Sequence, residues 1–103
     1  MISRYITDKG KLREINEYIP GMWINLTAPS QEESLEIANR YNIDITDVRA
    51  ALDDEEASRV DVSEDYVMVI FDIPTVEIRH NQQAYTTIPL GVILTEEVII
   101  TIC

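Results

Sequence analysis

The sequence predicts an α/β (α+β) fold, in which a mixed, largely antiparallel sheet carries two helices inserted between its strands. Two consecutive helix starts occur at residues 30 and 44, and strand-type patterns precede and follow them. Short turns join the later strands, and short turns imply antiparallel neighbours. Because the chain has 103 residues, we expect residues 1–103 to form a single domain with one modest core.

The first quarter of the chain contains two predicted strands and one ambiguous segment. Alternating β-forming residues predict a strand over Ile2–Ile6, and an Asp-Lys-Gly turn follows it. Residues 11–19 suit one face of a short helix, but a strand near Leu12–Ile15 suits them equally well. A Pro-Gly pair then breaks the chain before a short strand of buried type over Met22–Leu26.

The first helix is predicted near Ser30–Tyr41. Ser30 is its expected N-cap, and Glu33 stands at the third helical position, as in a capping box. Asn42 follows the last turn and tolerates the left-handed conformation that ends many helices.

The second helix is predicted near Asp44–Leu52, with Asp44 as its N-cap. Ile43 and Val48 occupy the two positions that form a hydrophobic staple across a helix start. Because both helices lie between strands, we expect them to cover one face of the sheet.

The remaining chain reads as four strands joined by short turns. The predicted strands are Ser58–Val62, Tyr66–Ile78, Ala84–Leu94 and Val98–Ile102. His80–Gln83 is the expected turn of the longest hairpin. Pro89 lacks an N–H group, so its strand should be an edge or carry a bulge there. Seven apolar side chains are expected to be largely buried: Trp23, Leu35, Val48, Leu52, Val69, Phe71 and Ile93.

The net charge of −11 disfavours partners that are themselves anionic. Such a field repels phosphate backbones and anionic membrane surfaces, so we expect no nucleic-acid partner, and it attracts cations. No apolar run approaches the length of a membrane span, and there is no signal peptide. The chain stops at the end of a β-forming stretch, which leads us to expect a soluble fragment of a longer protein.

The sequence offers no catalytic residues, and we expect no enzyme. The only histidine, His80, lies in a predicted polar turn without a neighbouring nucleophile. The only cysteine, Cys103, lacks the basic neighbours that activate a thiol. No glycine-rich phosphate loop is present.

The acidic run after the second helix is the candidate for ion binding. Asp53, Asp54 and Glu56 supply oxygen ligands of the kind that Mg²⁺ prefers, although their spacing is not that of an EF-hand. The alternative is a solvated acidic loop. Arg59 follows three residues after Glu56, and we expect an ion pair between them.

Three stretches occur in an order that resembles the cytoplasmic N-terminal domain of CorA-like magnesium transporters. The stretches are MWINLTAPSQEE, ALDDEEASRVDVSEDYVMVIFDIP and YTTIPLGVILTEEVIITI, within Met22 to Ile102. The matching positions are Trp23, Asn25, Glu33, Glu56, Arg59, Tyr66, Pro74, Pro89, Leu90 and Thr101.

The resemblance implies the soluble regulatory part of a homo-oligomeric Mg²⁺ channel, pentameric in the family. A long helix and two membrane helices would follow it, so the full-length protein would lie in the cell membrane with this domain on the cytoplasmic side. Its partners would be other subunits, and its contact with the membrane would come only through the later segments.

One feature of the sequence departs from the family pattern. Family members place carboxylates near the end of the second helix, where they meet a neighbouring subunit's acid across a divalent ion. Arg49 and Ala50 occupy that place here, so the site is in doubt or has moved to Asp53–Glu56. A different hypothesis is a stand-alone acidic interaction module that binds a basic partner.

Overall fold

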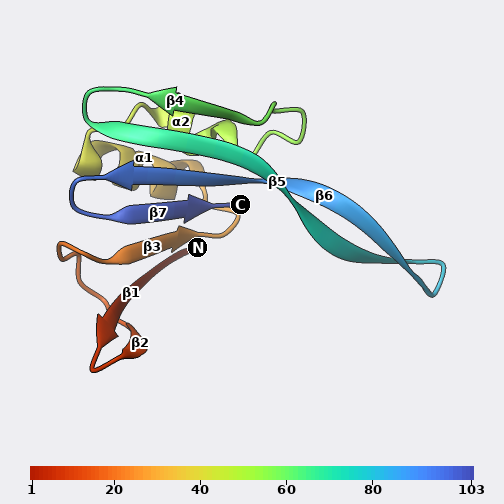
Figure 1. Cartoon of the computed structure of the whole chain (residues 1–103), viewed down its shortest axis with the longest axis horizontal. Coiled ribbons are helices and arrows are strands. Elements are labelled where there is room, and N and C mark those ends of the chain that lie inside the picture. Colours follow the sequence, from red (N-terminus) through yellow and green to blue (C-terminus); the bar gives the residue numbers. More distant parts are fainter.

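The computed structural model describes residues 1–103 as one seven-stranded sheet with two helices (Figure 1). The strands in sheet order are β2 (Lys11–Glu14), β1 (Ile2–Asp8), β3 (Trp23–Leu26), β7 (Ile99–Ile102), β6 (Gln82–Thr95), β5 (Tyr66–Arg79) and β4 (Arg59–Val62). The helices are α1 (Gln31–Tyr41) and α2 (Ile45–Ala50).

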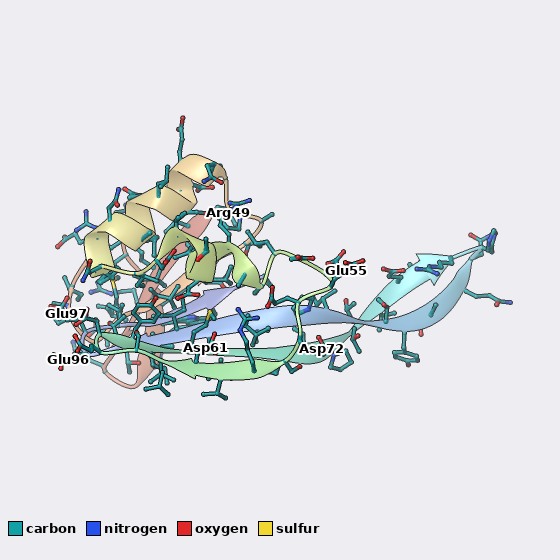
Figure 2. All side chains as sticks on the ribbon, turned by 90° about the horizontal axis from the view of Figure 1, so that it is seen from above. Arg49, Glu55, Asp61, Asp72, Glu96 and Glu97 are labelled. Atoms are coloured by element: carbon teal, nitrogen blue, oxygen red, sulfur yellow. The ribbon has the colours of Figure 1, made fainter.

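The sheet is mixed but largely antiparallel, which confirms the predicted fold class. Only β3 and β7 run parallel, and every other neighbouring pair is antiparallel. Both helices follow β3 and lead to β4 at the opposite edge, so they cross one face of the sheet. Figure 2 shows this helical layer on one side, with no element over the other side.

The predicted starts of both helices and the predicted end of α1 are confirmed, whereas α2 ends at Ala50, two residues before the predicted end at Leu52. Ser30 Oγ accepts from the Glu33 amide, and the Glu33 carboxylate accepts from the Ser30 amide, so the capping box is complete. Asn42 adopts the left-handed conformation with φ of 54°. Asp44 caps α2 by accepting from the Thr46 amide at 2.9 Å.

Two local predictions are resolved or changed by the structure. Residues 11–14 form β2, because they pair with β1 across a tight turn, and no helix forms there. The turn of the long hairpin is shorter than predicted and contains only His80 and Asn81, both with positive φ. Gln82 and Gln83 belong to β6 because they still pair with β5.

The core lies between the helices and one face of the sheet. It contains thirteen buried residues: Met22, Ile24, Leu26, Ile37, Ala38, Ile43, Val48, Met68, Ile70, Ile93, Val98, Ile100 and Ile102. The predicted burial of Val48 and Ile93 is confirmed, and Leu52 and Val69 are half-buried.

Five burial predictions need correction, because Leu52 and Val69 are, like Trp23, only half-buried. Phe71 is 39% exposed and Leu35 is 40% exposed, so the prediction for both was wrong. Trp23 is only half-buried. Trp23 and Phe71 point to the side of the sheet that has no helix, and Leu35 lies outside the buried stripe of α1, which consists of Ser34, Ile37 and Ala38.

Candidate functional site

The most distinctive surface of the molecule is the sheet face that no helix covers, here called the open face. Strand residues alternate between the two faces, so the neighbours of each core residue point to the open face. Apolar side chains predominate there, and several are substantially exposed: Val60, Val62, Phe71, Leu94 and Ile99. An apolar sheet face without a second layer is typical of a contact surface.

A chain of hydrogen bonds crosses the open face between β3 and β7. Trp23 Nε1 donates to Thr101 Oγ1 at 2.8 Å, and Thr101 Oγ1 donates to Asn25 Oδ1 at 2.7 Å. The parallel pairing of the two strands places Asn25 directly beside Thr101. The Tyr5 ring lies against the Trp23 ring with centroids 4.8 Å apart. Three residues that carried the family resemblance therefore form one connected group.

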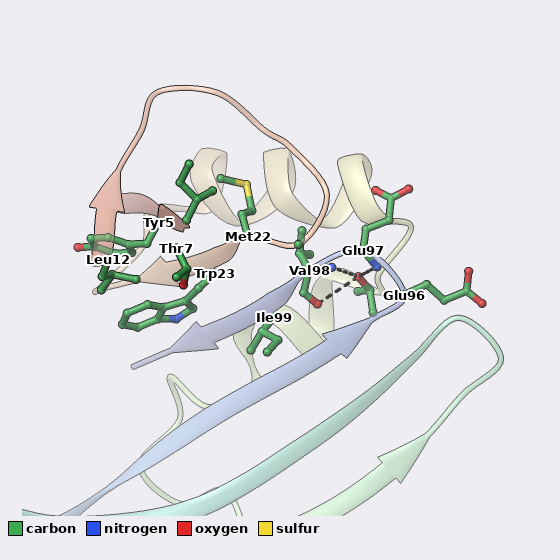
Figure 3. Close-up of a pocket in the computed structure, with 12 residues that line it drawn as sticks. Tyr5, Thr7, Leu12, Met22, Trp23, Glu96, Glu97, Val98 and Ile99 are labelled. Atoms are coloured by element: carbon green, nitrogen blue, oxygen red, sulfur yellow. Dashed lines mark hydrogen bonds between the residues drawn. The ribbon is translucent and has the colours of Figure 1, made fainter. Parts of the chain in front are cut away.

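A groove of about 360 Å³ begins beside this group (Figure 3). Trp23, Leu12 and Ile99 line its apolar part, whereas Glu96 and Glu97 lie at its other end in the β6–β7 turn. The Thr95 hydroxyl accepts from the Glu97 and Val98 amides and so fixes that turn. The groove thus combines an aromatic wall with two carboxylates, a combination that suits a segment with apolar and basic side chains.

The predicted metal ligands lie in the turn after α2, where Figure 2 shows Glu55 beyond the helical layer. Asp53 and Asp54 are exposed, and Asp53 Oδ1 already accepts from the Glu55 amide at 3.0 Å. Glu56 is partly buried and paired with Arg59. No three Asp, Glu, His or Cys side chains are grouped so as to hold a metal ion. Metal binding by Asp53, Asp54 and Glu56 therefore stays a prediction.

The predicted ion pair of Arg59 is confirmed, and it extends further than expected. The Arg59 guanidinium pairs with Glu56 and also with Asp61, whose Oδ2 lies 2.8 Å from Nε. The side chain of Arg59 is 33% exposed. The pairs connect the acidic turn to the edge strand β4.

Sequence reasoning missed the structural role of Arg49. Its Nη1 donates to Ser34 Oγ at 2.8 Å and to the Pro29 carbonyl at 3.3 Å. Ser34 is completely buried. Arg49 therefore connects α2 to the start of α1. The only sequence signal for such a contact was a serine at position 34, at helical spacing with the apolar residues Ile37 and Ala38.

Tyr66 ties the start of β5 to the start of α2. Its hydroxyl donates to the Asp47 carboxylate and accepts from the Asp44 amide. Partial burial and the hydrogen bond to Asp47 raise the pKa of Tyr66 above its usual value of 10.0. This contact fixes the distance between the second helix and the sheet.

Neither helix is both long enough and apolar enough to cross a membrane.

Comparison with known proteins gives consistent results. Among curated proteins, the cobalt/magnesium transport protein CorA from Methanocaldococcus jannaschii is 28% identical over 81 residues, which are 79% of this chain and 24% of that protein. The chain therefore spans about a quarter of the length of this relative.

Two solved structures from the same organism share the fold. The complete structure of the CorA magnesium transporter matches with a TM-score of 0.77 and 22% identity, covering 99% of this chain and 32% of that one. The soluble domain of CorA matches with a TM-score of 0.75 and 22% identity, covering 99% and 40%. The family model described as CorA-like Mg²⁺ transporter protein matches residues 21–103, which is most of the chain. The chain belongs to the CorA-like Mg²⁺ transporter family.

Proposed function

We propose that this chain is the cytosolic domain of a CorA-like divalent cation transporter and contributes to ion sensing and gating in the full-length oligomer. The domain itself transports no ion and catalyses no reaction. The observation that carries the proposal is the family match over residues 21–103, on a fold shared with the soluble domain of a CorA protein.

In this proposal the chain acts within a longer membrane protein made of several identical subunits. A long helix and two membrane helices belong to the remainder, and the domain lies on the cytoplasmic side of the cell membrane. The open face supports this arrangement, because an apolar sheet face is stabilised when further segments cover it. The groove beside Trp23 is the place where such a segment would pack first.

The acidic turn is the proposed point of ion sensing. Mg²⁺ prefers six oxygen ligands and keeps several of its waters, so one exposed turn offers it only one or two carboxylates. Because Asp53 and Glu56 already have partners, Asp54 is the freest of the three proposed ligands. We therefore expect millimolar affinity in the isolated chain, which corresponds to about −4 kcal/mol. A second chain or segment would have to complete the site.

A melting-temperature titration with MgCl₂ tests the sensing site, with NaCl matched for ionic strength to subtract screening. We expect a Mg²⁺-specific rise in melting temperature that disappears in the variant Asp53→Asn, Asp54→Asn, Glu56→Gln. The matched control neutralises three other exposed acids: Glu14, Glu17 and Asp72. Micromolar binding that survives in the first variant would show that the site lies elsewhere.

Transport by the longer protein tests the function as a whole. The gene that encodes residues 1–103 within its full reading frame should restore growth of a bacterium deficient in Mg²⁺ uptake. Neutralising Asp53, Asp54 and Glu56 should then raise the internal Mg²⁺ concentration at which uptake stops, while the control variant behaves as the wild type. An unchanged shut-off concentration would remove the sensing role and leave the transporter assignment intact.

One observation favours the alternative function, which is a stand-alone acidic interaction module that binds a basic partner. Glu96 and Glu97 stand at the end of an apolar groove, as an amphipathic basic segment would require. Failure to restore Mg²⁺ uptake, together with salt-sensitive binding of a basic amphipathic peptide that depends on Glu96 and Glu97, would favour this alternative.

A further inference from the structure

We draw no further inference here: the strongest candidate, the exposed apolar face that Val76, Ile78 and Tyr85 form on the projecting hairpin of β5 and β6, carries nothing because no feature of the structure shows what covers it.

Discussion

Arg49 shows how one side chain connects parts of the molecule that are distant in sequence. Its guanidinium reaches from α2 to the buried Ser34 hydroxyl and the Pro29 carbonyl at the start of α1. Ser34 Oγ in turn donates to the Ser30 carbonyl at 2.9 Å. Arg49 therefore has a structural role in joining the two helices.

Replacing Arg49 by methionine should destabilise the fold by about 1–3 kcal/mol, because the Pro29 carbonyl loses its donor and Ser34 loses one partner. Urea denaturation at neutral pH measures the effect. Arg13→Met is the control, since Arg13 is 61% exposed and should tolerate the change. Equal stability of the two variants would contradict a structural role for Arg49.

Arg59 should contribute less to the stability of the fold than Arg49, although it makes two ion pairs. The pairs with Glu56 and Asp61 are accessible to water, and exposed pairs contribute no more than about 1 kcal/mol. We expect Arg59→Gln to lower the melting temperature slightly and Arg79→Gln to leave it unchanged, both followed by circular dichroism. Loss of folding in Arg59→Gln would mean that the guanidinium is essential to the core.

The positions of the two helices are set by the N-caps at which they begin and by their close approach to the sheet. Ser30 and Asp44 begin the two helices with side-chain caps. The end of α2 then lies so close to β6 that a Cβ atom added at Gly91 would lie 2.8 Å from Ala51 Cβ. Helix and strand therefore meet where neither carries a large side chain.

Gly91→Ala should destabilise the protein by about 1–3 kcal/mol because of this overlap. Adding Ala51→Gly should recover part of the loss, and a double-mutant cycle of unfolding free energies measures the coupling. Strictly additive effects would show that the helix moves away from the strand at no cost.

The helix starts also predict how stability depends on pH. The hydrogen bond from the Ser30 amide, together with the nearby N-terminus, lowers the pKa of Glu33 below 4.5, and the hydrogen bond from the Thr46 amide lowers the pKa of Asp44 below 3.8. A carboxyl group with a lowered pKa stabilises the fold while it is charged, and this contribution disappears as the pH falls through the lowered pKa.

The variant Glu33→Gln, Asp44→Asn retains capping groups but cannot titrate. Its urea midpoint should therefore lie below that of the wild type at neutral pH, and the difference should shrink between about pH 5 and pH 3. A constant difference over that range would show that these two carboxylates do not carry the acid sensitivity.

For the whole molecule, the net charge and the one-sided helical layer together determine how readily the chain compacts and associates. The net charge of −11 lies on a chain whose sheet has a helical layer on one side and an open apolar face on the other. Self-repulsion opposes compaction, and the open face favours association. Self-repulsion depends on the summed charge and association depends on the assembled sheet, so neither effect belongs to a single residue.

Raising NaCl from about 0.01 M to 0.15 M should raise the melting temperature, because the Debye length falls from about 30 Å to 8 Å and the negative charges repel each other less. Differential scanning calorimetry measures the change. At pH 4.2, the isoelectric point of the sequence, the effect should nearly vanish. A salt effect of equal size at both pH values would point to a cause other than net charge.

The sequence alone determined the helix starts, most of the strands and the family. Caps at Ser30 and Asp44, apolar alternation and turn residues act over a few neighbours, so they can be predicted without knowledge of the fold. The same local patterns, taken in order along the chain, were enough to identify the CorA-like resemblance that the family match confirms.

Only the tertiary structure decided which apolar residues are buried and which residues meet. Trp23 and Phe71 are as apolar as their neighbours Ile24 and Ile70 on the same strands. The helices pack on one face of the sheet alone, so Ile24 and Ile70 are buried while Trp23 and Phe71 lie on the open face. The Trp23–Thr101 hydrogen bond and the Arg49–Ser34 contact likewise depend on which strands and helices become neighbours. Periodicity specifies two faces of a strand, but burial depends on whether another layer covers each face, and that is decided by the packing of the whole chain.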